Sequence, residues 1–252
     1  MIVSDKYKLI LTLPQKCATG TLQLRLSEVR DLEPYAQGGA WYCRELDKLV
    51  SKHMKVEDIV KLKDFKRRRK FYRACFVRNP YDRVYSWFEW FSFSYKQRVE
   101  CGKLDFAKHQ LASNKDIDGV HLAFVRNSEW MGRALEKCKG NFNDFLRLNQ
   151  NRYSLASSFT HYKGKKWVDF LGRVETFEDD FEDFCELCEL DVNLFDNDDK
   201  SFNASQLPSR IPQTIEDHKY LSRYSEESIK IVNDIMKDDF KLLGYKKFLH
   251  AV

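Results

Sequence analysis

Near its start the chain reads Lys8-Leu9-Ile10-Leu11-Thr12-Leu13-Pro14-Gln15-Lys16-Cys17-Ala18-Thr19-Gly20-Thr21-Leu22. The apolar residues before Pro14 are typical of a central parallel strand, which we expect over residues 2–13. Pro14 ends this strand, and a helix is predicted over residues 21–32 because Leu22, Leu26 and Val29 share one face. A strand, a loop of small residues and a helix in this order favour an α/β fold.

The loop between this strand and helix has the composition of an anion site. Backbone N–H groups at a helix N-terminus, together with the helix dipole, attract negative charge. Lys16 adds a mobile positive charge, and Thr19 and Thr21 add hydroxyl donors. The loop is not a Walker A motif, in which lysine follows the last glycine, because Lys16 precedes Gly20. A capped core helix with an incidental lysine is the alternative interpretation.

A second strand-to-helix corner follows later in the chain, in the stretch Cys75-Phe76-Val77-Arg78-Asn79-Pro80-Tyr81-Asp82-Arg83-Val84-Tyr85-Ser86. Pro80 ends the apolar strand and is tolerated as a first helical residue. Arg78 offers a planar pair of donors to a phosphate, and Ser86 adds a hydroxyl two turns along the helix. An ion pair between Arg78 and Asp82 is the alternative.

The two corners together resemble the nucleotide motifs of sulfotransferases that use 3′-phosphoadenosine 5′-phosphosulfate (PAPS). Residues 16–21 resemble the 5′-phosphosulfate loop, and residues 76–86 resemble the 3′-phosphate motif. Residues 170–175 and the endings Asp239-Phe240 and Gly244-Tyr245 resemble later segments of the carbohydrate-type (sulfotransferase family 2-like) branch. The resemblance implies a P-loop-like three-layer α/β fold, with a central mainly parallel sheet flanked by helices.

This resemblance implies transfer of a sulfuryl group from PAPS to a hydroxyl or amine of a carbohydrate or small-molecule acceptor, releasing PAP. Lys16 is the expected catalytic cation at the leaving phosphate, and in the family a loop in the place of residues 201–215 closes over the nucleotide. The residues expected to bind PAPS are Lys16, Cys17, Ala18, Thr19, Gly20, Thr21, Leu22, Arg78, Ser86 and Arg210.

A general base must take the acceptor's proton, and His or Glu usually serves. His121 is the expected catalytic base or acceptor-orienting residue, at a position that resembles a family histidine. His53 and Glu45 are rivals, because they lie between the two nucleotide motifs. Arg173 and Glu175, at the end of a third strand, are expected to hold the acceptor, with a mutual ion pair as the alternative.

Composition limits the classes of protein that remain. The chain has 252 residues, 43% of them hydrophobic, and a net charge of +5. We therefore expect one globular domain over residues 1–252, with enough positive charge for a polyanionic nucleotide. The basic run at residues 66–70 is interpreted as a solvated loop or a wall for an anionic acceptor, without nucleic acid as a partner. A P-loop-like kinase or hydrolase and a non-catalytic polyanion-binding module are the competing hypotheses.

Cysteine usage and hydropathy indicate a reducing compartment. Seven cysteines at irregular spacing do not form a disulfide framework, and we expect a cytoplasmic protein. Cys185 and Cys188 form one CxxC pair inside an acidic amphipathic helix, so no metal site is expected. Without an apolar run of membrane-spanning length, the chain resembles the soluble members of the family. Its oligomeric state is left open.

The remaining elements follow from periodicity and capping. Strands are predicted over residues 40–43, 74–77 and 168–173, and helices over residues 44–63, 81–97, 127–137 and 141–149. Residues 116–121 are predicted to form a turn. Thr176 is expected to cap a helix whose buried stripe is Phe177, Phe181, Phe184 and Leu187. Ser225 is expected to cap the last helix, and Gly244 to end it.

Overall fold

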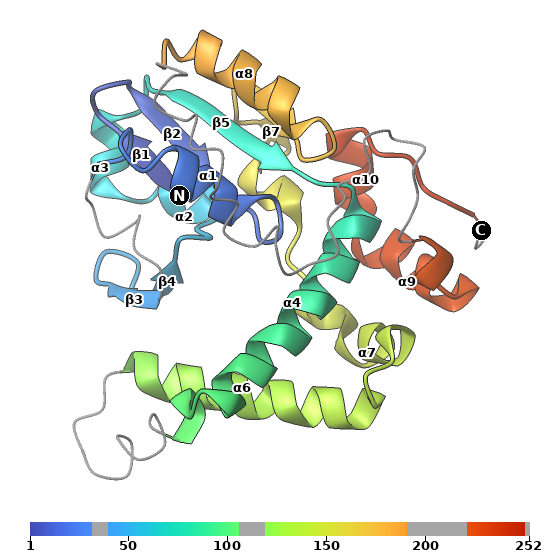
Figure 1. Cartoon of the computed structure of the whole chain (residues 1–252). Helices are drawn as coiled ribbons and strands as arrows, with labels where there is room; N and C mark the ends of the chain where they lie inside the picture. Colours follow the sequence, from blue (N-terminus) through green and yellow to red (C-terminus); the bar gives the residue numbers. More distant parts are fainter. Residues whose placement is uncertain (32–39, 106–118, 191–220, 250–252) are drawn as a thin grey trace. The chain divides into compact units, whose positions relative to one another are not determined.

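The computed structural model describes residues 1–31, 40–105 and 119–190, and then residues 221–249. The chain forms two compact units (Figure 1). The sheet unit comprises Met1–Asn79, Ser154–Lys219 and Lys241–Tyr245, and the helical unit comprises Pro80–Tyr153, Tyr220–Phe240 and Lys246–Val252. Each unit is described separately below. The prediction of one domain over the whole chain stays a prediction.

The sheet unit is built on four strands in the order β1-β2-β5-β8. Their bounds are Ile2–Ser4, Leu9–Thr12, Tyr72–Val77 and Phe170–Arg173. β2 pairs with β5 and β5 with β8 in parallel, whereas β1 pairs with β2 antiparallel. The predicted mainly parallel sheet is therefore confirmed. The single strand predicted over residues 2–13 is wrong, because the polar residues between Ser4 and Leu9 form a turn, in which Lys8 has a φ of 48°.

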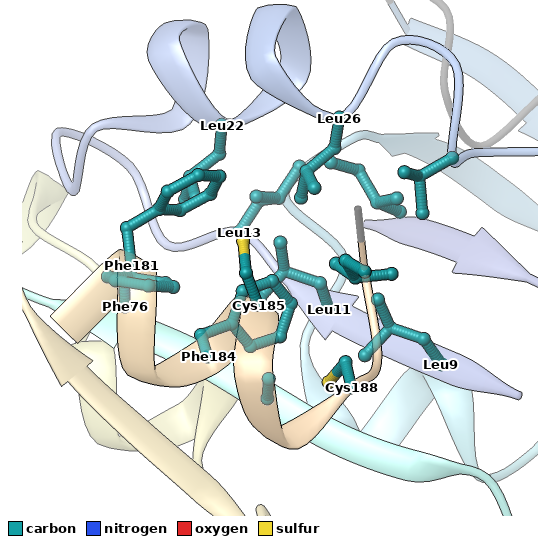
Figure 2. Close-up of a cluster of buried hydrophobic side chains, with 14 of the residues drawn as sticks. Leu9, Leu11, Leu13, Leu22, Leu26, Phe76, Phe181, Phe184, Cys185 and Cys188 are labelled. Atoms are coloured by element: carbon teal, nitrogen blue, oxygen red, sulfur yellow. The ribbon is translucent and has the colours of Figure 1, made fainter. Parts of the chain in front are cut away.

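One face of the sheet carries the main apolar core (Figure 2). Alternate residues of β2 and its continuation point to this face, where they meet α1 (Thr19–Arg25) and α8 (Phe177–Leu187). Leu187 is 60% exposed, so its place in the predicted stripe is wrong. The other residues of that stripe and the CxxC cysteines lie inside the core, among Leu9, Leu11, Leu13, Leu22, Leu26, Phe76, Phe177, Phe181, Phe184, Cys185 and Cys188.

The N-terminus of α8 differs from the predicted cap. Thr176 occupies the N-cap position, but its hydroxyl donates to the Asp180 carboxylate at 3.1 Å and accepts no helix N–H. The same carboxylate oxygen accepts the backbone N–H of Arg173. The start of α8 is therefore tied to the end of β8 through Asp180, a link that the capping pattern does not reveal.

The segment after α1 forms a hairpin and short helices. β3 (Ala40–Cys43) is confirmed and pairs antiparallel with β4 (Lys48–Ser51). The long helix predicted over residues 44–63 is wrong, because the chain turns at Asp47, with a φ of 50°, and then forms β4. Only α2 (Val56–Ile59) and α3 (Lys63–Arg67) are helical in this region. The sheet unit also contains η3 (Ala156–Phe159), β6 (His161–Tyr162) and β7 (Lys165–Lys166).

The basic run at the end of α3 is divided between surface and interior. Arg68 is buried and forms a bidentate pair with Asp5, at 2.8 Å for both contacts. The other cations of residues 66–70 are exposed. The interpretation as a solvated segment therefore holds for all of the run except Arg68, which fixes the turn between β1 and β2.

The helical unit contains α4 (Pro80–Glu100), α6 (Gly119–Cys138), α7 (Phe142–Asn149) and α9 (Glu226–Ile235). It also contains the turns η2 (Gln150–Arg152) and η5 (Leu221–Arg223), and the first residues of α10 (Lys237–Leu243). The aromatic side chains of α4 pack against α7, with Phe88 and Phe91 at centroid distances of 5.1 and 4.9 Å from Phe145. These rings form part of the core of the helical unit, whereas Trp90 and Phe93 of the same helix are exposed.

The last helix has the predicted ends, but the prediction of one continuous helix is wrong, because α9 ends at Ile235 and α10 begins at Lys237. Ser225 caps α9 by accepting the N–H of Ser228 at 3.2 Å. Gly244 follows α10 with a φ of 73°, a conformation that suits glycine at a helix C-terminus. Gly119 belongs to the first turn of α6, so the turn predicted to include it is wrong there. Among the helices in the described ranges, none has the length and apolar character needed to cross a membrane.

Candidate functional site

Three parallel strands end at one edge of the sheet. The register pairs Thr12 of β2 with Cys75 of β5, and Val77 of β5 with Arg173 of β8. Neighbouring strands lie about 4.8 Å apart, and ligands of open α/β sheets bind beyond their carboxyl ends. The loop that contains Lys16 and the corner that contains Arg78 therefore leave adjacent strands at the same edge.

The first loop has a backbone suited to binding an anion. Lys16 and Ala18 have left-handed φ values of 65° and 52°, on either side of Cys17. Alternating left-handed and right-handed residues turn N–H groups toward a common side. Thr19 begins α1, and its buried hydroxyl donates to the carbonyl of Pro14 at 3.0 Å. The side chain of Thr19 therefore closes the loop, and its expected contact with a phosphate stays a prediction.

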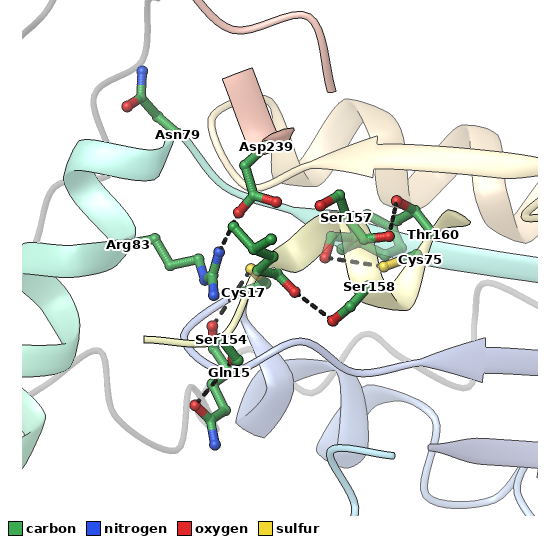
Figure 3. A network of polar contacts seen from close by, with 12 residues as sticks. Gln15, Cys17, Cys75, Asn79, Arg83, Ser154, Ser157, Ser158, Thr160 and Asp239 are labelled. Carbon is green, nitrogen blue, oxygen red and sulfur yellow. Dashed lines mark hydrogen bonds and ion pairs between the residues drawn. The ribbon is translucent and has the colours of Figure 1, made fainter. Parts of the chain in front are cut away.

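Other predicted residues of this loop support its shape. The thiol of Cys17 is buried and contacts the carbonyl of Gln15 at 3.7 Å, and the Gln15 amide oxygen accepts the hydroxyl of Ser154 at 3.5 Å (Figure 3). The N–H of Leu22 donates to Ala18 at 2.9 Å, and its side chain lies in the core. Lys16 and Thr21 are half-buried, and Gly20 lies in the first turn of α1.

The second corner is held by the end of β8. The N–H of Val174 donates to Val77 at 2.9 Å, and the N–H of Asn79 donates to the carboxylate of Glu175 at 2.5 Å. Arg78 lies between these two contacts and is half-buried. The hydrogen bonds therefore fix the backbone on both sides of the residue that is expected to bind a phosphate.

The residues expected to hold the acceptor contact the C-terminal segment. The guanidinium of Arg173 donates to Leu243 at 2.9 Å and lies 4.5 Å from the ring centroid of Tyr245. Tyr245 donates its hydroxyl to Glu175 at 3.0 Å. The pKa of Tyr245 is raised well above its usual value, first by burial and then by the charge of Glu175. Sequence reasoning missed this role of Tyr245, whose only signal was its position after Gly244.

His53 lies beside the first loop. Its Nδ1 is 2.7 Å from the carbonyl of Leu13, at the end of β2. Because a carbonyl only accepts, Nδ1 carries the proton and Nε2 keeps a lone pair. The pKa of His53 is lowered to about 4, chiefly by burial and also by the charges of Lys52 and Lys16, against the opposing effect of the hydrogen bond to Leu13. His53 is therefore neutral at neutral pH.

A cavity of about 210 Å³ lies next to His53. Polar groups line much of it, including Ser51, Lys55 and an ion pair of 2.6 Å between Lys48 and Asp58. Glu45, the other rival base, is exposed and accepts the N–H of Lys63 at 2.8 Å. Of the two rivals, the structure therefore brings His53 to the first loop and gives Glu45 a role at the start of α3.

In the helical unit, Pro80 begins α4 as predicted, and Ser86 is buried in its second turn. Arg83 forms a buried ion pair of 2.7 Å with Asp239 (Figure 3). His121 lies in the first turn of α6, and Arg210 lies outside the described residues, as does the loop at residues 201–215. The roles of Ser86, His121 and Arg210 stay predictions of the sequence.

A comparison with protein-family models shows to which family the chain belongs. The model described as "Sulfotransferase family" matches residues 1–246. The chain belongs to this family. This sulfotransferase therefore uses PAPS as its sulfate donor, as the family implies, and the kinase and non-catalytic hypotheses are set aside. No curated protein and no solved structure is significantly similar to the chain.

The geometry of the sheet unit fits such a donor. PAPS carries phosphate groups at both ends of its ribose, so its site needs cations from two places. Lys16 and Arg78 come from adjacent strand ends, and the loop around Lys16 has the backbone of an anion site. The residues at this edge of the sheet therefore fit PAPS, the donor that the family implies.

Proposed function

We propose that this sulfotransferase transfers the sulfuryl group of PAPS to a hydroxyl of a carbohydrate or small polar acceptor. When bound, PAPS supplies the sulfuryl group and leaves as PAP. The observation that carries the proposal is the adjacency of the Lys16 loop and the Arg78 corner at the ends of β2 and β5. Lys16 binds the 5′-phosphate end and Arg78 the 3′-phosphate end.

Lys16 is the proposed electrostatic catalyst. Negative charge develops on the oxygen that bridges the sulfuryl group and the 5′-phosphate as that bond breaks. An ammonium group fixed beside this oxygen stabilises the charge more in the transition state than in the ground state, which is the requirement for a rate effect. The loop geometry supports this role, because the left-handed Lys16 and Ala18 turn backbone N–H groups toward a common side, next to which an anion can bind.

His53 is the proposed general base. Its Nε2 accepts the proton that the acceptor hydroxyl loses as the new oxygen–sulfur bond forms. The hydrogen bond to Leu13 orients the ring, and the low pKa keeps Nε2 unprotonated at neutral pH. The polar cavity beside His53 supports an acceptor rich in hydroxyl groups, since Ser51 and Lys55 offer hydrogen bonds there.

The first test is the binding of PAP, followed by an acceptor screen. A ligand at about 100 times its Kd stabilises a protein by about 2.7 kcal/mol. For a chain of this size, that raises Tm by about 5–10 °C. We expect 1 mM PAP to raise Tm by such an amount, and labelled PAPS to label hydroxyl-bearing saccharides. No shift with PAP, together with a shift on magnesium and ATP, would contradict the proposal.

The two candidate bases are separated by matched variants. We expect His53→Gln to lower kcat by about 10²–10⁴ with the best acceptor of the screen, while PAP affinity is retained. His121→Gln is the control, and the expectation is a smaller effect on kcat. The opposite order, with His121→Gln the inactive variant, would move the base to α6.

A further inference from the structure

Glu175 and Tyr245 form a buried polar pair next to the Arg78 corner. Their relative solvent exposures are 8% and 9%. The two oxygens of Glu175 have different partners. Oε1 accepts the N–H of Asn79 at 2.5 Å, and Oε2 accepts the hydroxyl of Tyr245 at 3.0 Å. A carboxylate is rarely buried unless its oxygens are hydrogen-bonded, and here each oxygen has a donor.

Tyr245 is itself held in place. Its ring lies 4.5 Å from the guanidinium of Arg173, which also donates to the carbonyl of Leu243 at 2.9 Å. Gly244, between these residues, has a φ of 73° and lets the chain turn after α10. The C-terminal segment is therefore clamped onto the end of β8, with the tyrosine hydroxyl directed at Glu175.

These contacts restrain the peptide on each side of Arg78. On one side the carbonyl of Val77 accepts the N–H of Val174 at 2.9 Å. On the other side the N–H of Asn79 is bound by Glu175. Both contacts come from the two residues that follow β8, so the direction of the Arg78 side chain depends on them. Because a cation must be held within about 0.5 Å of its productive position, the support of its backbone matters for binding.

We propose that Glu175 and Tyr245 are positioning residues, which fix the corner so that Arg78 engages the 3′-phosphate of the nucleotide. This rests on the proposed function, because it presumes that Arg78 binds that phosphate. It replaces the expectation that Glu175 holds the acceptor. It also assigns a role to Tyr245, a residue distant in sequence from both nucleotide motifs.

A ligand pair isolates the 3′-phosphate. PAP carries both phosphates, and adenosine 5′-monophosphate lacks the one at the 3′ position. The Kd of adenosine 5′-monophosphate divided by the Kd of PAP, both measured by isothermal titration calorimetry, reports what the 3′-phosphate contributes to binding. A loss of general stability weakens both ligands and leaves the ratio unchanged. A misplaced Arg78 lowers the ratio.

We expect Glu175→Ala to lower this ratio at least tenfold, because it removes a charge-assisted hydrogen bond from the corner. Tyr245→Phe keeps the ring and removes only the hydroxyl, so the expected loss is about twofold to tenfold. Glu175→Gln keeps an acceptor for the N–H of Asn79, and should recover most of the ratio lost in Glu175→Ala. Tyr245→Phe and Glu175→Gln carry the test if Glu175→Ala does not fold.

The matched control is Thr12→Val. It removes another buried hydroxyl of the same sheet, which donates to the carbonyls of Phe159 at 2.9 Å and Ala74 at 3.3 Å, and it leaves the contacts of Glu175 and Tyr245 in place. We expect it to lower Tm and leave the ratio intact. An unchanged ratio in Glu175→Ala and Tyr245→Phe, or an equal fall in Thr12→Val, overturns the proposal. Failure of the wild-type protein to bind PAP would instead refute the proposed function, before any variant is compared.

Discussion

His53 should make the stability of the sheet unit depend on pH in a defined window. Its pKa falls from 6.5 in the unfolded chain to about 4 in the folded protein. The unfolded state therefore binds more protons between these two values, and the free energy of unfolding decreases as the pH falls from about 6.5 to about 4. Well above pH 6.5 His53 is neutral in both the folded and the unfolded state, and its contribution to stability is constant.

The size of the effect follows from the same interval. A shift of one pKa unit corresponds to 1.36 kcal/mol. Between pH 6.5 and pH 4, His53 therefore lowers the free energy of unfolding by about 3 kcal/mol in total, and by about 2 kcal/mol at pH 5. His53→Gln is the matching perturbation, because an amide can still donate to Leu13 but does not titrate. The difference in free energy of unfolding between wild type and variant should therefore change by about 2 kcal/mol between pH 7 and pH 5.

Urea unfolding at several pH values measures this difference, and NMR titration of the imidazole gives the pKa directly. His161→Gln serves to assign the signal of another histidine in the sheet unit. An NMR pKa near 6.5 for His53, or parallel pH profiles for wild type and His53→Gln, would refute the reasoning.

Three further predictions concern single side chains. Lys16→Ala should keep the fold and lower kcat at least 10²-fold in a labelled-PAPS assay, and near-normal turnover would exclude the catalytic role. Arg83→Ala leaves Asp239 buried without the ion pair of 2.7 Å, so we expect the free energy of unfolding to fall by about 3–5 kcal/mol in urea; a loss below 1 kcal/mol would contradict this. Gly172→Ala would place a Cβ 2.5 Å from the ring of Phe76, and should cost about 1–3 kcal/mol by the same assay, whereas an unchanged midpoint would show that the ring can move.

The nucleotide corners were predictable because their signals are local. Pro80 marks a strand end and a helix start in one residue, and the structure begins α4 there. The small residues after Pro14 predict the loop in the same way.

The errors arose where a pattern fits two structures. The turn between β1 and β2 contains only a few polar residues between two apolar runs, so one long strand fits equally well. The segment with β4 and α2 carries apolar residues at spacings compatible with one helix, and strands of four residues give a weak alternation. In both places, pairing with distant residues decides the structure.

The contacts of two site residues were not evident from the sequence. The hydroxyl of Thr19 donates within its own loop, although its position suggested a phosphate contact. Tyr245 reaches Glu175 across 70 residues of sequence. The partner of Tyr245 is not encoded in a local pattern, since it depends on which chain segments meet at the end of β8.

The central claim is that two corners of one sheet edge bind opposite ends of a single nucleotide. The most direct test is calorimetric titration of Arg78→Ala with PAP and with adenosine 5′-monophosphate. Removing a charge-assisted contact of about 1.5–3 kcal/mol should weaken PAP tenfold or more and leave the monophosphate within about twofold of wild type. Equal losses for both nucleotides, or unchanged affinity for PAP, would contradict the account.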